Sequence, residues 1–309
     1  MIITVTMNPA IDKTVDLELL ERGSVNRISN VIVDAGGKGI NVSKAVKALG
    51  GDSIATGFIG GSGGVLIEKV LGELGITADF VHIKQDIRTN LKVVEKNGFV
   101  TEFNEPGPVI GDDELNQLID KLEGYANADT IFVLAGSIPN GIDKSIYKTI
   151  IDKVKAKGAK VFLDASGDLF TNSLLAKPDI IKPNRHELEA YFNMDYRADE
   201  KELIRMGNEL LEKGIETVTI SLGQMGALFL TKDKKVKCPG LKVEAHSTVG
   251  AGDSMVAAIT YGIDQKLEFA DCIRLGIATS AGAVTTKGTK PPTRELVDEL
   301  MKKVEVVEL

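Results

Sequence analysis

Strand-like and helix-like segments alternate along most of this chain, and this alternation limits the possible folds more than any other feature. Runs rich in Val, Ile and Thr occupy residues 2–6, 53–59, 130–134, 160–163, 180–182 and 217–221. Between them, apolar residues recur with helical spacing at 41–49, 65–74, 113–122, 144–155, 201–212, 251–261 and 269–284. Parallel strands need crossover helices, so this order predicts an α/β fold whose mostly parallel sheet is covered on both faces.

One part of the chain breaks the alternation. Residues 91–95 and 99–103 are β-rich and flank Asn97-Gly98, a pair that tolerates positive φ and is typical of a hairpin turn. Residues 13–33 are also strand-like. We interpret these stretches, approximately 12–34 and 86–106, as a small β lid outside the main layers; two edge strands of the main sheet are the alternative. With no internal repeat or linker, residues 1–309 are expected to form a single domain.

Composition narrows the class of partner. The 309 residues carry a net charge of −7 with no basic stripe, which argues against nucleic acid. The first residues read as a strand rather than a signal peptide, and no apolar run is long enough to span a membrane. Cys238 and Cys272 stand far apart and form no CxxC pair. We therefore expect a cytoplasmic protein with small-molecule partners, and with neither nucleic acid nor membrane among them.

The stretch 247–258 combines small residues, a carboxylate and the start of an apolar helix. Gly250, Ala251 and Gly252 leave the backbone open to a ligand. A helix N-terminus offers unpaired N–H groups and a partial positive charge to an anion. Asp253 adds a candidate base beside that anion site. The combination is typical of an enzyme that transfers a phosphoryl group to an alcohol.

A second glycine-rich run, residues 35–43, lies between a strand-like segment and an amphipathic helix. Its glycines would allow close approach of a ligand, while Lys38 could meet a phosphate and Asn41 a hydroxyl. A turn whose glycines serve only geometry is the alternative. Neither run completes GxGxxG, because Met255 and Val42 stand where the third glycine belongs, and no GxxxxGK[ST] occurs. A Rossmann dehydrogenase and a P-loop enzyme are therefore not favoured.

Three further turns follow predicted strands. Asn184 and Glu187 share a helix face, so Glu187 could orient Mg²⁺. The same spacing is typical of a capping box, and this motif taken alone favours the cap. Residues 221–226 are either a nucleotide-contacting turn or a hairpin link to 227–230. Ala135, Gly136 and Ser137 end a strand with small residues, where α/β sheets usually bind ligands.

A serine hydrolase is the alternative from another class of enzyme. Gly60-Gly61-Ser62-Gly63-Gly64 matches GxSxG between a strand and a helix. A nucleophilic Ser62 needs a histidine, and His82, His186 and His246 all lack a persuasive setting. No HExxH or His/Cys cluster with metal-ligand spacing occurs.

Taken together and in order, three motifs resemble those of the ribokinase-like carbohydrate kinases, also called the PfkB family. They are AGGKGxN at 35–41, KPNxxE at 182–187 and GAGD at 250–253. The opening TVTMNPAID, residues 4–12, resembles the subgroup acting on sugar phosphates, namely 1-phosphofructokinases and tagatose-6-phosphate kinases. The resemblance covers nearly the whole chain. It implies a three-layer α/β/α fold with a small β-sheet lid, which in this family covers the sugar and often forms a dimer contact.

The resemblance also implies roles for the matching residues. Asp253 would be the general base, and the N–H groups of Gly250, Ala251 and Gly252 would hold the transferred phosphoryl group. The sugar site would comprise Asp12, Gly36, Gly37, Lys38, Asn41, Arg88, Asn90 and Ser137, with Lys38 and Arg88 on the substrate's phosphate. The ATP site would comprise Lys182, Asn184, Ser221, Gly223, Gly226 and Thr248, with Glu187 on Mg²⁺. Ser247 departs from the family, which often has Asp or Asn there.

The expected activity is therefore an ATP-dependent sugar-phosphate kinase that converts fructose 1-phosphate to fructose 1,6-bisphosphate. A tagatose-6-phosphate kinase is the alternative within the family. A serine hydrolase using Ser62 and a catalytically silent sugar-phosphate sensor are the alternatives from other classes. The expected cofactors are ATP and Mg²⁺, and a homodimer through the lid is the expected form of any self-association.

Overall fold

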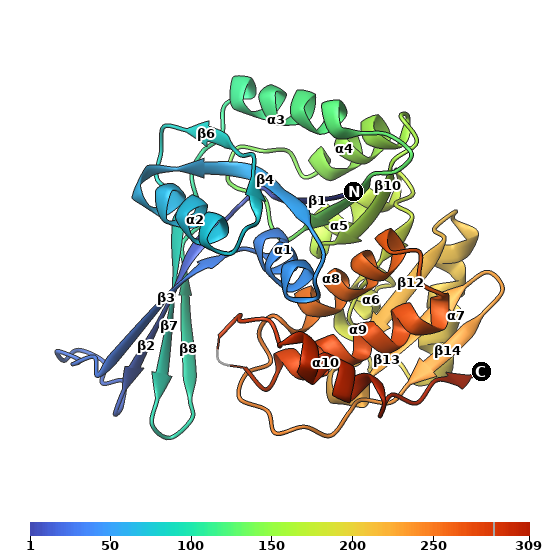
Figure 1. Cartoon of the computed structure of the whole chain (residues 1–309). Helices are drawn as coiled ribbons and strands as arrows, with labels where there is room; N and C mark the ends of the chain where they lie inside the picture. The colour runs from blue at the N-terminus through green and yellow to red at the C-terminus, as the bar shows by residue number, and fades with distance from the viewer. Residues whose placement is uncertain (287) are drawn as a thin grey trace.

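The computed structural model describes residues 1–286 and 288–309. Its main body is a large sheet with helices packed on both faces (Figure 1). In spatial order the strands are β15 (Val307–Glu308), β14 (Lys235–Cys238), β13 (Ala227–Thr231), β12 (Thr217–Ser221), β11 (Ile180–Ile181), β10 (Lys160–Asp164), β9 (Ile131–Ala135), β1 (Ile2–Thr6), β4 (Ser53–Gly60) and β5 (Thr77–Ala78), with β6 (Val81–Ile83) also on β4. Pairing is parallel from β12 to β5 and antiparallel between β12, β13, β14 and β15. The predicted mostly parallel sheet is confirmed.

Strand β1 shows why the sheet is buried on both faces. All five of its residues are buried, and its side chains alternate between the two layers of the core. Ile3 and Val5 join one apolar cluster and Ile2 joins the other. A strand without a polar face is stable only when both of its faces are covered, which is the three-layer arrangement that was predicted.

The helices divide between these two clusters. One cluster takes its helical residues from α3 (Asp112–Tyr125), α4 (Ile146–Lys155), α5 (Gly167–Leu174), α6 (Arg185–Tyr191) and α7 (Glu200–Glu212). The other takes them from α1 (Lys38–Ala48), α8 (Ala251–Asp264), α9 (Phe269–Ala283) and α10 (Arg294–Met301). Helix α2 (Gly61–Glu73) packs beside β4 in a third cluster that includes Ile59, Ile67 and Ile87.

Four strands form a separate sheet, called here the small sheet, that projects from the main body (Figure 1). Their order is β3 (Asn30–Gly36), β2 (Ala10–Leu17), β7 (Arg88–Glu95) and β8 (Val100–Asn104). The hairpin predicted around Asn97-Gly98 is confirmed, since β7 and β8 pair antiparallel and Gly98 has φ +89°. The alternative that these residues form edge strands of the main sheet is wrong.

Some boundaries differ from the prediction. Helices α1 and α2 begin at Lys38 and Gly61, before the predicted starts at residues 41 and 65. Glycines therefore occupy the first turn of each helix. A Cβ at Gly63 would lie 2.7 Å from Ile87 Cγ1, so tertiary packing, rather than an irregular turn, explains that glycine. Helices α5 and α10 were not predicted because they are short. Within the described residues, no helix combines the length and the apolar character needed to cross a membrane.

Candidate active site

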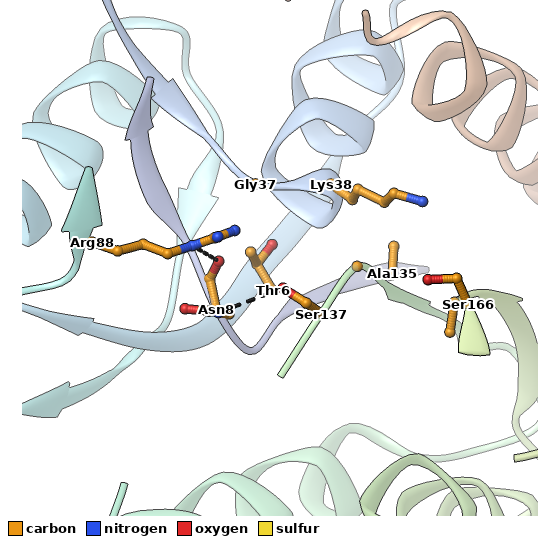
Figure 2. Close-up of a pocket in the computed structure, with 10 residues that line it drawn as sticks. Thr6, Asn8, Gly37, Lys38, Arg88, Ala135, Ser137 and Ser166 are labelled. Atoms are coloured by element: carbon orange, nitrogen blue, oxygen red, sulfur yellow. Dashed lines mark hydrogen bonds between the residues drawn. The ribbon is translucent and has the colours of Figure 1, made fainter. Parts of the chain in front are cut away.

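A cavity of about 250 Å³ lies beyond the carboxyl ends of β1, β9 and β10, the usual ligand position in a parallel sheet (Figure 2). Four predicted residues line it, namely Gly37, Lys38, Arg88 and Ser137. Ala135 and Gly136, which were expected beside a ligand at the end of their strand, also line it, whereas the sequence-based site lacked Thr6, Asn8, Ala165 and Ser166. Because these residues directly follow or end predicted strands, their position along the chain was the signal that could have identified them.

Two cations reach this cavity. Lys38 opens α1 and Arg88 opens β7. Arg88 donates from Nε to the backbone oxygen of Asn8 at 3.3 Å and from Nη1 to that of Glu105 at 3.3 Å, and Figure 2 shows it reaching toward Asn8 and Thr6. Among the described lining residues there is no carboxylate. The cavity therefore offers positive charge to an anionic ligand although the whole chain is acidic.

The central carboxylate of the site, Asp164, was missed by sequence reasoning. It ends β10, and its side chain is only 1% exposed. Lys38 Nζ lies 3.2 Å from its Oδ2 and Lys182 Nζ lies 3.3 Å from its Oδ1. Burial by itself would raise the pKa of Asp164, but the charges of Lys182 and Lys38 outweigh burial and hold the pKa below its usual value. Asp164 thus fixes both ammonium groups at the edge of the sheet.

Asp253 lies in the first turn of α8 and is almost fully buried. Its Oδ2 accepts a hydrogen bond of 2.9 Å from Asn41 Nδ2. Burial, followed by the charge of Asp164, raises the pKa of Asp253, while Lys38, Asn41 and Lys182 act in the opposite direction. A carboxylate with a raised pKa has a greater tendency to take up a proton, which suits the predicted role of general base.

The glycines beside Asp253 bring the helix backbone close to this charge cluster. Gly250 caps α8 in the left-handed conformation, with φ +81°. A Cβ at Gly252 would lie 3.3 Å from Lys182 Nζ. The first N–H groups of a helix have no partner within it, so those of Ala251 and Gly252 are available to an anion. Thr248 is exposed in the preceding loop.

Asp12, Asn90 and Gly36 meet at the base of the small sheet, outside the set of residues that line the cavity. Asn90 Nδ2 donates to Asp12 Oδ1 at 2.9 Å. A side chain at Gly36 would clash with the carboxylate of Asp12. Burial raises the pKa of Asp12 above its usual value. The structure therefore brings these three predicted sugar-site residues together on adjacent strands.

Asn184 and Glu187 form the capping box that was considered for them. Asn184 Oδ1 accepts from the Glu187 backbone N–H at 2.9 Å, and Glu187 Oε2 accepts from the Asn184 N–H at 2.8 Å. The charge of Glu187 also contributes to the raised pKa of Lys38, after the larger opposing effect of burial and the contributions of Asp164 and Asp253. Glu187 is thus a helix cap within electrostatic range of the cavity.

The turn at residues 221–226 lies beside this cap. The Ser221 N–H donates to the Pro183 oxygen at 3.0 Å, next to the bridge between Asn184 and Ser221. The turn also links β12 to β13, which pair antiparallel, so the hairpin interpretation is confirmed. A side chain at Gly226 would clash with the Cys238 oxygen, whereas Gly223 faces open space. Packing therefore explains the glycine at position 226, whereas no described atom fills the Cβ direction of Gly223.

The donor groups near Glu187 fit a metal ion that arrives with a nucleotide. Within residues 1–286 and 288–309, no three or more His, Cys, Asp and Glu side chains cluster in a way that would hold a metal by themselves. Mg²⁺ usually keeps several waters and binds one or two carboxylates together with substrate phosphates. The carboxylate of Glu187 could supply the single protein ligand that such an ion needs when phosphates and waters supply the others.

Ser62 does not have the surroundings of a hydrolytic nucleophile. Its backbone N–H donates to Asp86 Oδ1 at 3.0 Å. In the described part of the chain no histidine hydrogen-bonds to Ser62, and His82 instead lies 3.3 Å from Glu68. A side chain at Gly61 would clash with Asp86. The glycines around Ser62 are thus explained by close packing against neighbouring residues.

The chain is similar to known carbohydrate kinases over nearly its whole length. The family model described as pfkB family carbohydrate kinase matches residues 5–296. The chain is 38% identical to a 1-phosphofructokinase of Borreliella burgdorferi over 92% of this chain and 91% of the relative. It is 36% identical to a 1-phosphofructokinase of Bacillus subtilis over 100% of both chains. Its fold matches phosphofructokinase-2 from Escherichia coli in complex with potassium with a TM-score of 0.93 and 27% identity, covering 98% of each chain.

Proposed function

Because the chain belongs to the pfkB family of carbohydrate kinases, we propose that its acceptor is fructose 1-phosphate and its products are fructose 1,6-bisphosphate and ADP. It is an ATP-dependent phosphotransferase that acts on a sugar hydroxyl. The observation that supports a phosphorylated acceptor is the cavity itself, where Lys38 and Arg88 stand without a carboxylate among the described lining residues. Lys38 shares the single charge of Asp164 with Lys182, and Arg88 hydrogen-bonds to backbone oxygens, so a phosphate on the sugar would add counter-charge that a neutral sugar lacks.

In the proposed reaction, Arg88 and Lys38 hold the phosphate already on the sugar, and the acceptor hydroxyl faces Asp253. The hydroxyl oxygen forms a bond to the γ-phosphorus of ATP, the bond between that phosphorus and ADP breaks, and the proton passes to the Asp253 carboxylate. Asn41, which donates to Asp253 Oδ2 at 2.9 Å, orients that carboxylate. The backbone N–H groups at Gly250, Ala251 and Gly252 face the transferred group. Positioning and fixed charges supply the rate enhancement.

We assign the nucleotide to the edge next to the sugar cavity, with Lys182, Asn184, Ser221, Gly223, Gly226 and Thr248 along it. Glu187 is the proposed protein ligand of Mg²⁺, which would neutralise charge on the ATP phosphates. Lys182 is held in place by its 3.3 Å ion pair with Asp164. The single carboxylate of Glu187 supports a metal that enters with the nucleotide.

We propose that the chain acts as a single kinase domain in which the small sheet is the lid over the sugar. Strands β2, β3 and β7 carry Asp12, Gly36 and Asn90 at the base of the small sheet, close in sequence to the cavity residues Gly37 and Arg88. A lid that excludes water would limit hydrolysis of ATP in the absence of sugar.

The small sheet is also the proposed dimer contact. Its outer strands β3 and β8 expose Val31, Ile32, Val33, Val100 and Phe103, each more than two-fifths exposed. Exposed apolar edge strands tend to pair with another chain. Analytical ultracentrifugation should give a dimer for the wild-type chain and a monomer for an Ile32→Asp/Phe103→Asp variant; a wild-type monomer at assay concentration would contradict the contact.

A substrate panel tests the proposed acceptor. ADP release should be fastest with fructose 1-phosphate, compared with tagatose 6-phosphate and fructose 6-phosphate. A preference for tagatose 6-phosphate would show that this sugar is the acceptor and would leave the assignment as a sugar-phosphate kinase unchanged. Binding of sugar phosphates without turnover would support the silent sensor. The serine hydrolase alternative is wrong, because the chain belongs to a kinase family.

A further inference from the structure

Strand β3, the helix α1 that follows it, and a loop 255 residues further along the chain meet at Asp34, near the end of β3. Lys44 of α1 lies with its Nζ 2.8 Å from Asp34 Oδ1. Thr289, in the loop between α9 and α10, donates from Oγ1 to Asp34 Oδ2 at 2.9 Å. Each carboxylate oxygen of Asp34 therefore holds one of two separate elements, a helix on one side and a loop on the other.

The ion pair between Lys44 and Asp34 is held in one geometry because the Lys44 side chain is buried. The Lys44 side chain is 4% exposed, and its Nζ also donates to the Ala35 backbone oxygen. A buried ammonium must remain paired, so Asp34 has little freedom to leave it. Lys44 also lies three residues after Asn41 on α1, the helix face from which Asn41 reaches Asp253.

Thr289 lies against the phosphoryl end of the site. A Cβ at Gly250 would lie 3.7 Å from Thr289 Cα and 3.8 Å from its Cβ, which is ordinary van der Waals contact. The loops on either side are joined by the backbone, since His246 N donates to the Val284 oxygen at 2.7 Å and Ser247 N donates to it at 3.1 Å. Thr289 thus lies beside Gly250, on the side to which a Cβ at residue 250 would point.

The other side of Asp34 faces the sugar end. Asp34 is the direct cross-strand partner of Asp12 in the ladder between β2 and β3. The Asp34 carboxylate therefore lies between a residue assigned to the acceptor sugar and a loop that packs on the residue assigned to the phosphoryl group.

We propose that Thr289, held by Asp34 and Lys44, is a positioning residue that sets the Gly250 turn against the base of the small sheet. The hydroxyl of Thr289 touches neither substrate. It acts by fixing the loop that lies beside Gly250, so that the phosphoryl cradle and the sugar-binding strands keep one relative position. The inference rests on the proposed kinase function, because its main readout is phosphoryl transfer.

The test compares Thr289→Val, which removes the hydroxyl at nearly constant volume, with Thr289→Ser, which keeps it. We expect Thr289→Val to lower kcat about tenfold, because small misplacements of reacting groups are costly, with the KM for both substrates and the Kd for ATP changed less than about threefold. Thr289→Ser should retain the wild-type kcat. Thr285→Val is the matched control, since within residues 1–286 and 288–309 the Thr285 hydroxyl donates to the Gly282 oxygen of its own turn alone.

A double variant separates positioning from general loop damage. Asp34→Asn/Thr289→Val should have the same kcat as Asp34→Asn, because the remaining Asn oxygen would face the Lys44 ammonium and the Thr289 hydroxyl would already have lost its acceptor. Independent, multiplying losses would overturn the proposal, as would an unchanged kcat in Thr289→Val or an equal loss in Thr289→Ser. If Asp34→Asn does not fold, the comparison of Thr289→Val with Thr289→Ser still tests the proposal. The wild-type rate with the sugar-phosphate panel separately tests the kinase function, so the two failures are distinguishable.

Discussion

Two glycine-rich segments, residues 36–41 (called here the first turn) and residues 60–64 (the second turn), each run from the end of a strand into the start of a helix, α1 in one case and α2 in the other. In the first turn, Gly37 and Lys38 line the cavity and Asn41 reaches Asp253. In the second turn, Gly61 packs on Asp86 and Gly63 on Ile87. Similar local sequences therefore have different uses, and the difference depends on what the fold places opposite the glycines.

The second turn still contributes to the site indirectly. Its contacts are with residues 85–87, directly before Arg88 at the start of β7. The Ile87 N–H donates to the Gly60 oxygen at 3.3 Å and Ser62 N–H donates to Asp86. The first turn thus supplies functional groups, whereas the second fixes the segment that delivers Arg88 to the cavity.

The largest effect is expected at the carboxylate that the first turn orients. Asp253→Asn should lower kcat at least ~100-fold, because it removes the proposed base. The same variant should be more stable than wild type at neutral pH: folding raises the pKa of Asp253, so the ionised form costs stability there, and Asn carries no charge. Stopped assays and thermal unfolding would measure both. A near-normal kcat would exclude Asp253 as the base.

Arg88 should give the next largest effect. Arg88→Ala is expected to raise the KM for the sugar phosphate about tenfold or more, because a charge-assisted contact to its phosphate is lost, and to change the KM for ATP less than about threefold. Initial rates with each substrate varied in turn give the two constants. Equal changes in both would mean that Arg88 serves structure rather than the acceptor phosphate.

A change in the second turn should have a smaller, mixed effect. Gly61→Ala introduces a Cβ into Asp86 at φ +62°, so we expect about 1–3 kcal/mol lower stability and a severalfold higher KM for the sugar phosphate through displaced Arg88. Gly72→Ala is the matched control, because Gly72 lies in the same helix with open space around it. It should be neutral or stabilising by up to about 1 kcal/mol. Denaturant unfolding and the KM for the sugar phosphate are measured for both variants. Lower stability of Gly61→Ala with an unchanged KM would show that the second turn does not position Arg88.

A pH profile should show a shift when the first turn loses its contact with Asp253. Asn41 donates to the ionised carboxylate and so acts to lower the pKa of Asp253. In Asn41→Ala this effect is lost and the pKa rises further. Since the base must be ionised, the acidic limb of the kcat/KM profile should move to higher pH. A limb that moves to lower pH would show that another group controls it.

The smallest effect is expected at Ser62, where Ser62→Ala should leave kcat and KM within about twofold of wild type, because its contact to Asp86 uses the backbone N–H. Loss of activity in this variant would contradict the division between the two turns. The expected kcat is measured with the same ADP-release assay.

Much of the fold could be predicted because its signals are local. β-branched runs and helical periodicity give the alternation, and the pair Asn97-Gly98 gives the hairpin of the small sheet. The short helices α5 and α10 and the start of α1 were not predicted correctly, since tertiary packing sets them. The capping box at Asn184 was also readable, because its two partners are three residues apart.

The sequence by itself determined the layered α/β architecture and the candidate base Asp253, because these depend on residue order and on motifs within short windows. Only the tertiary structure revealed Asp164 between Lys38 and Lys182, and Asp34 between Lys44 and Thr289. Those contacts join residues that are distant in the chain, and nothing local records them. The tertiary structure also decided whether a glycine-rich turn lines the cavity or packs against the protein, because the atoms opposite the glycines belong to other segments of the chain.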